Sequence, residues 1–386
     1  MVDRWSRRQA MIVSDSITGV TALAIMFLVF SQQLQVWHIY IAVGISSVCN
    51  AFQWPAYISA ISQLVPPQHL SRANGMVQGA IATARILGPS IAGLLIIKIH
   101  LHGILLIDFS TYLLAFFTLL SVKFPRSQQK KIRRKVNIEE LWQEVVSGWN
   151  YVVVRTGLRQ LTIFFGVIYL SAGVLQVLFL PMVLSFASEK ELGIVMSVSG
   201  IGMLLGSVIV SLWGCSKRRI EGILIFVFIQ GLCLFMGGLK PAVIWAALGG
   251  FGYLFSRAIV VSLNHTIWQQ KVPQHLQGRV FALQNMMEKF LLVITHLSAA
   301  PLVEFMFKPL MSENGILASS VGRIIGVGDG RGIALLFVLM GLLNIGAVLV
   351  AYRIPELRRV ERKFNNADRF PVNETETDNT KQTVLM

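Results

Sequence analysis

The sequence has few charged residues, few cysteines and none of the short motifs that carry common enzyme chemistry. Charged residues make up 14% of the 386 residues and hydrophobic residues 54%, whereas an average soluble chain is about 25% charged. The cysteines Cys49, Cys215 and Cys233 are too scattered for a disulfide framework or a zinc site. A Walker loop, His-Glu-x-x-His and Gly-x-Ser-x-Gly are missing from the sequence. These absences argue against an ATP-driven pump, an enzyme, a resident metal and a bound cofactor.

The hydrophobic residues occur in blocks of about twenty, the length that an α-helix needs to cross about 30 Å of hydrocarbon. This pattern predicts an all-α, polytopic membrane protein with the lipid bilayer as its solvent. We expect about ten transmembrane helices, four in the first half of the chain and six in the second. The predicted spans are residues 9–31, 37–62, 74–98, 101–122, 160–184, 191–213, 219–239, 241–264, 280–306 and 332–353.

Lys and Arg outnumber Asp and Glu by 34 to 19, which gives a net charge of +15. In a soluble protein this excess would suggest nucleic acid, but here the basic residues follow the loops. Of the 34, 25 fall in the termini and alternate loops on one side, and six fall in the loops on the other. By the positive-inside rule both termini are cytoplasmic. The charge pattern therefore predicts a multi-pass protein of the plasma (inner) membrane that has no nucleic-acid partner.

A basic and then amphipathic segment, residues 123–159, divides the chain. The stretch at 64–72, which contains Pro-Gln-His-Leu, returns at 271–279, so the two halves are predicted to be parallel repeats. We expect an N-terminal bundle at 1–122, a cytoplasmic linker with an interfacial helix at 123–159, a C-terminal bundle at 160–353 and a disordered tail at 354–386. The imbalance of four spans against six predicts that about two helices of the repeat precede Met1.

Two short patterns have the residues of known transporter motifs. Asp3-Arg4-Trp5-Ser6-Arg7-Arg8 is similar to the end of a cytoplasmic loop motif, with Ser6 where glycine is usual. Gly79, followed by Gly88-Pro89 and Gly93, is similar to an antiporter motif, although Ala92 replaces one of its glycines. Glycines let helices approach closely and a proline bends its helix. Both patterns also have simpler interpretations, since arginines fix topology and Gly and Pro are common in membrane helices.

On these motifs, residues 1–363 resemble the major facilitator superfamily, especially the bacterial efflux branch that includes the enterobactin exporter and macrolide efflux proteins. The resemblance implies a two-bundle fold and a monomeric secondary carrier. It also implies export of a small amphipathic molecule, such as a drug or siderophore, in exchange for protons. Two other hypotheses stay open: a truncated or non-transporting membrane protein, and an uptake permease of the same fold.

Charged residues inside the spans are the candidates for substrate binding and proton coupling, because each costs about 2.5 to 3.5 kcal/mol at a helix centre on insertion scales. Arg85 lies one turn before Gly88 and is expected to face either an anionic substrate or a carboxylate. Glu288 and His296 are eight residues apart, hence near one helical face, and are candidates for proton exchange. A purely structural role is the alternative for each. The full set is Arg85, Asp108, Arg257, Glu288, Lys289 and His296.

Overall fold

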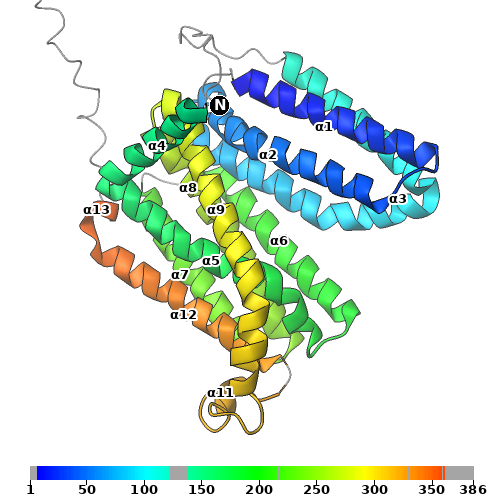
Figure 1. Ribbon diagram of the computed structural model, residues 1–386. Coiled ribbons are helices and arrows are strands. Elements are labelled where there is room, and N and C mark those ends of the chain that lie inside the picture. Colours follow the sequence, from blue (N-terminus) through cyan, green and yellow to red (C-terminus); the bar gives the residue numbers. More distant parts are fainter. Residues whose placement is uncertain (1–6, 122–137, 215–217, 329, 359, 361–386) are drawn as a thin grey trace, which may run out of the picture.

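The computed structural model describes residues 7–121, 138–214, 218–328, 330–358 and 360, and every regular element in these ranges is a helix (Figure 1). Eight helices are long and apolar enough to cross a membrane, or nine if one bent pair counts as a single span. Helix α2 is not among these, and its middle carries Asn50, Gln53 and Pro55. Each of the ten predicted spans nevertheless coincides with a helix or with one arm of a bent helix.

The first half of the chain makes four passes with three helices: α1 (Arg7–Phe30), α2 (Val36–Leu64) and α3 (Leu70–Ser121). Helix α3 follows the short 3-10 turn η1 (Pro67–His69) and contains two of the predicted spans. It bends by 51° between its arms Pro67–Gly88 and Ile91–His100. At His100 (φ 54°, ψ −176°) the backbone leaves the helical region. After this break the last part of α3 runs back to the start of α1, where Arg8 donates a hydrogen bond to the Leu120 carbonyl at 2.5 Å.

The second half contains six long helices that pack around one core. They are α5 (Thr156–Leu184), α6 (Glu189–Trp213), α7 (Arg219–Leu239), α8 (Val243–Lys271), α9 (Gln274–Leu302) and α12 (Arg331–Arg353). The core is apolar, with Trp268, Tyr253 and Phe337 among its largest fully buried side chains. Helix α4 (Ile138–Val154) precedes this bundle and packs against α9 and α5.

Short elements complete the second half. After α9 the chain continues through the π-helix η2 (Val303–Phe307), α10 (Lys308–Leu310) and α11 (Gly322–Ile325) before entering α12. After α12, helix α13 (Pro355–Arg358) packs on α5, and Leu357 and Val360 are buried. The packed chain thus extends to Val360, past the predicted start of the tail at 354. The rest of the predicted tail and the basic part of the linker lie outside the described residues.

Local sequence explains where helix α6 begins and ends. At its start, the Glu191 amide donates to Ser188 Oγ at 3.4 Å, and the Ser188 amide donates to Glu191 Oε2 at 2.8 Å. This reciprocal capping box satisfies backbone donors that the first helical turn leaves free. At its end, Gly214 adopts a left-handed conformation with φ of 55°, which costs glycine little.

The Val-Pro pairs at the start of the two repeated stretches have the same backbone conformation, although Pro67–His69 then form the 3-10 turn η1 whereas Gln274 begins α9 directly. Val65 (φ −112°, ψ 129°) and Val272 (φ −96°, ψ 125°) are extended and end α2 and α8. Pro66 (−56°, 145°) and Pro273 (−55°, 142°) follow them and lead into the next helix. A residue before proline is sterically pushed out of the helical region, so the same letters end both helices alike.

Both stretches lie at one end of the molecule, here called the repeat end, defined by residues 65–70 and 272–276. The side-chain amide of Gln270 donates to the Pro67 carbonyl at 2.8 Å and joins the two turns. The opposite end, defined by residues 303–325, is called the loop end. Contacts between the halves run from α3 to α6 and α8, and from α2 to α9. In Figure 1, α1, α2 and α3 meet the second bundle at these contacts and separate from it further along.

Candidate functional site

A network of uncharged polar side chains holds the two halves together near the repeat end. Asn74 of α3 donates to Thr266 Oγ1 at 3.0 Å and to Gln269 Oε1 at 2.8 Å, both on α8. Gln269 in turn donates to the Ile58 carbonyl of α2 at 2.8 Å. Asn74, Thr266 and Gln269 are at most 4% exposed. We call Asn74, Thr266, Gln269, Ser62 and Gln277 the amide lock.

Ser62 and Gln277 extend this network to the contact between α2 and α9. The Ser62 hydroxyl donates to Gln277 Oε1. The Gln277 amide donates to the carbonyls of Gln269 and Val272, at 2.8 and 3.0 Å. Each of these hydrogen bonds contributes about 0.5 to 1.5 kcal/mol to stability, although the buried Asn74 Oδ1 has no hydrogen-bond partner among the described residues. The lock therefore favours a conformation in which the repeat end is closed.

Close helix packing accompanies the lock. A Cβ atom on Gly75 would lie 2.8 Å from the backbone nitrogen of Ser211 on α6, and one on Gly79 would lie 3.2 Å from Ser207 Oγ. At Gly75 a side chain would clash with backbone, whereas at Gly79 the Ser207 side chain would have to move by a few tenths of an ångström. Gly88 and Gly93, in contrast, have no atom within 4 Å of their Cβ positions. Helix α3 thus touches α6 over the first part of the glycine pattern and has left it by the second, beyond the bend at Pro89.

Three of the predicted charged residues come together where the halves begin to diverge. Arg257 of α8 and Arg85 of α3 are close enough to repel each other electrostatically. Glu288 of α9 attracts Arg257, and the neutral hydroxyl groups of Tyr169 on α5 and Tyr253 on α8 lie near it. Helices α3, α5 and α9 each contribute one of these side chains, and α8 contributes two. We call Arg85, Arg257, Glu288, Tyr169 and Tyr253 the central cluster.

The central cluster lies at mid-depth. Arg257 and Glu288 are near the midpoints of the 29-residue helices α8 and α9, and Tyr169 is near the midpoint of the 29-residue α5. Arg85 is halfway along the part of α3 that precedes the break, from Leu70 to His100. Ala82, Met203 and Ala258 form a small buried group beside the two arginines, at the junction of α3, α6 and α8. Charge is therefore concentrated in the middle of the spans, beside the last contact between the halves.

A second polar group, which the sequence prediction did not include, lies inside the first half. Gln53 of α2 donates to Asp15 Oδ1 of α1 at 2.5 Å. Tyr112 of α3 faces the same aspartate and also interacts with Ser16. Asp15 is half-buried. The sequence could have identified Asp15, because it lies within the predicted span 9–31 and a carboxylate there is as costly as the charged residues that were chosen as candidates.

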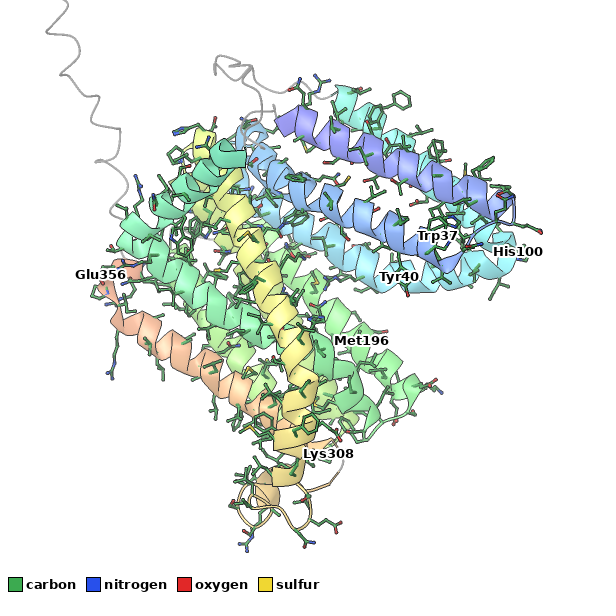
Figure 2. The ribbon with its side chains drawn as sticks, in the orientation of Figure 1. Trp37, Tyr40, His100, Met196, Lys308 and Glu356 are labelled. Carbon is green, nitrogen blue, oxygen red and sulfur yellow. The ribbon has the colours of Figure 1, made fainter. Side chains whose placement is uncertain are left out.

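The remaining predicted residues lie outside both groups. Asp108, Lys289 and His296 are exposed on the helix surfaces, and His296 Nδ1 lies 2.8 Å from the Leu292 carbonyl of its own helix. Asp3 and Arg4 fall outside the described residues, as does the side chain of Arg7, whereas Arg8 bonds to the end of α3. In Figure 2, Trp37, Tyr40 and His100 mark the end of the first half that is farthest from the contact, and Lys308 marks the loop end.

Two contacting helical bundles with charges at mid-depth define a polytopic membrane protein of a two-domain carrier type. The sequence model of the Major Facilitator Superfamily matches residues 1–295, and the chain belongs to this family. It is a multi-pass membrane transporter, and the predicted two-bundle all-α fold is confirmed.

Among characterised sequences, Macrolide efflux protein A of Enterococcus faecalis is 27% identical over 294 residues, which cover 73% of this chain and 88% of that protein. Macrolide efflux protein A of Streptococcus pyogenes is 26% identical over 376 residues, covering 94% and 84%. The human organic anion transporter MFSD10 has a similar structure, with a TM-score of 0.66 at 14% identity over 89% of this chain and 77% of that one. The Escherichia coli fucose:proton symporter has a TM-score of 0.55 at 13% identity over 90% and 84%.

Proposed function

We propose that this protein is a secondary active transporter that exports a small amphipathic molecule, such as a drug or siderophore, in exchange for protons. The observation that carries the proposal is the geometry of the two halves. They are joined by the amide lock at the repeat end, diverge beyond it and hold the central cluster where they part. A carrier that works by rocking two bundles about a central site passes through a conformation of this kind.

Export is supported by the relatives and by the charge pattern. Both macrolide efflux proteins are named for export, and they align over most of this chain. Arg72 and Lys271, which belong to the basic loops of the sequence, lie beside the two turns of the repeat end, and the positive-inside rule assigns these loops and both termini to the cytoplasm. The lock would then close the cytoplasmic side, and the central cluster would face outwards. We further propose that the protein acts as a monomer in the plasma membrane.

For the proton, Asp15 is a better candidate than Glu288 or His296. Glu288 lies near the cationic Arg257, which stabilises its charged form. His296 is exposed and is bonded within its own helix. Asp15 faces the neutral Gln53 from α2 and the hydroxyl of Tyr112 from α3, and no cation of the described residues acts on it. Burial away from water favours the protonated, neutral form of the Asp15 carboxyl group, although the hydrogen bond from Gln53 favours the charged form.

Transport into inside-out membrane vesicles that contain the full chain tests the proposal. We expect at least one of a set of radiolabelled amphipathic drugs, which includes macrolides and organic anions, to accumulate in the lumen when the lumen is acidic, and to leave again when nigericin abolishes the pH gradient. Vesicles without the protein are the control. Movement in the opposite direction would indicate an uptake permease, and the absence of any gradient-dependent movement of macrolides and other amphipathic drugs would refute proton-coupled export.

A further inference from the structure

We propose that Arg85 and Arg257 form a binding site for the anionic group of an amphipathic substrate. The inference rests on the proposed transport function and narrows its substrate class. The ligand would carry a carboxylate, sulfonate or phosphate at one end and an apolar body at the other.

The charges of the central cluster do not balance. Two guanidinium groups lie close enough to repel each other, one from each half of the molecule. Glu288 is the carboxylate whose charge acts on Arg257. Among the described residues, Arg257 is the charged group that acts on Arg85, and no carboxylate is seen to offset it. Because an uncompensated charge at this depth is costly, an anion from outside the protein would stabilise the cluster.

The position of Arg85 leaves it accessible to a ligand. Its side chain is exposed, although Ala82 one turn earlier is 1% exposed and packed against Met203 and Ala258. After Gly88 the helix bends by 51° and leaves α6. Arg85 therefore lies at the edge of the contact, where a molecule entering between the halves from the loop end would meet it.

A buried hydroxyl points to the same ligand. Tyr253 is 2% exposed, and its hydroxyl oxygen lies beside the Arg257 guanidinium, one turn later on α8. A guanidinium group cannot accept a hydrogen bond, and no acceptor for the Tyr253 hydroxyl proton is found among the described residues. A buried hydroxyl whose proton has no acceptor costs free energy, and an anion held by Arg257 would accept that proton. The site thus offers two guanidinium forks and one hydroxyl donor.

These donors favour an anion over a cation. A guanidinium group binds carboxylate, sulfonate or phosphate oxygens through two parallel hydrogen bonds. An ammonium group would be repelled by both arginines and attracted only by Glu288. Because Arg85 belongs to the first half and Arg257 to the second, one anion bound to both would also link the two bundles.

Equilibrium binding of two dyes to the purified full-length protein in phosphatidylcholine nanodiscs tests this site. Carboxyfluorescein and rhodamine 123 share a xanthene ring, but the first is anionic and the second cationic, so fluorescence polarisation compares charge on one scaffold. We expect carboxyfluorescein to bind more tightly than rhodamine 123. Arg85→Gln should weaken its binding by about tenfold or more, which is the size of one charge-assisted hydrogen bond, and Arg85→Lys should restore part of it.

Arg323→Gln is the matched control, because Arg323 is an exposed arginine of α11 at the loop end; its binding of carboxyfluorescein should be unchanged. Arg257→Gln leaves Glu288 without its attracting cation, so the double variant Arg257→Gln, Glu288→Gln removes both charges and should also weaken binding. The proposal is wrong if carboxyfluorescein does not bind, or if Arg85→Gln binds it as tightly as the parent.

A lipid headgroup carries the same chemistry as a soluble anion. The titration is therefore repeated in nanodiscs that contain phosphatidylglycerol. Unchanged affinity supports a soluble amphipathic anion, whereas loss of dye binding in these nanodiscs assigns the arginines to lipid and overturns the substrate assignment. Gradient-driven flux of a macrolide without dye binding would refute the anion site and leave the transport function standing. Dye binding without flux of any substrate would support the anion site and refute the transport function.

Discussion

Asn74 and Gln269 are joined by a hydrogen bond of 2.8 Å that crosses from the first half of the chain to the second. Both side chains are buried, and Gln269 continues the connection to the backbone of α2. The lock is therefore built of neutral amides, whose bonds can break and re-form without the desolvation of charge that a buried ion pair would demand. Such a contact suits an interface that opens in every transport cycle.

Removing the Gln269 amide should loosen the repeat end. Gln269→Ala leaves the buried Asn74 side chain with one partner fewer, so we expect a loss of about 1 to 3 kcal/mol in stability of the closed form. Maleimide labelling of a cysteine introduced at Ala82, on a background without native cysteines, reports the separation of α3 from α8 and should rise. Gln270→Ala, which removes the more exposed bond to Pro67, is the control. Equal labelling of the two variants would contradict a specific role for Gln269.

The glycine pattern of α3 can be divided by substitution. Gly75→Ala places a Cβ against the backbone of Ser211, so it should destabilise the closed form by about 1 to 3 kcal/mol. Gly88→Ala meets nothing within 4 Å and should leave thermal stability unchanged. If Gly88 forms a seal in the opposite conformation, Gly88→Ala should still slow substrate flux. Flux at the parental rate would instead indicate a packing kink without a role in transport.

The two carboxylates should respond differently to removal of their charge. Asp15→Asn keeps a side chain that can bond to Gln53 but cannot bind a proton, so we expect gradient-driven accumulation to be lost while exchange without a gradient persists. Glu288→Gln should retain its dependence on the pH gradient. Comparing flux at several lumenal pH values, with Asp15→Glu as the conservative control, measures this. Persistent gradient-driven accumulation by Asp15→Asn would exclude Asp15 as the proton site.

The fold was largely predictable because bilayer-length hydrophobic runs leave the backbone no alternative to helices. Residues 74–98 and 101–122 were separated correctly, at the point where His100 leaves the helical region. The repeated Pro-Gln-His-Leu stretches were expected on one side and indeed meet through Gln270 and Pro67. The bounds of α8 and α9 were less accurate, because their polar ends near Lys271 pack inside the protein instead of facing water.

The site was predictable only in part. The candidates were chosen because a charged residue is costly inside a membrane helix. This criterion found Arg85, Arg257 and Glu288, which come together, but it also included Asp108, Lys289 and His296, which do not. A charge has the same sequence signature wherever its helix face points. The lock residues were missed because Asn and Gln are ordinary in membrane helices, and only the packing of α3 on α8 gives Asn74 its partners.

A reversible cross-link across the amide lock tests whether the halves must part at the repeat end during transport. Asn74→Cys with Gln269→Cys is joined by a short methanethiosulfonate cross-linker and later released by a thiol; Ser171→Cys with Asn344→Cys, whose native side chains lie 3.1 Å apart within the second bundle, is the control. We expect vesicle flux to fall to background when the first pair is cross-linked and to return on reduction, and we expect cross-linking of the second pair to leave flux unchanged. Undiminished flux through a protein cross-linked between residues 74 and 269 would contradict it.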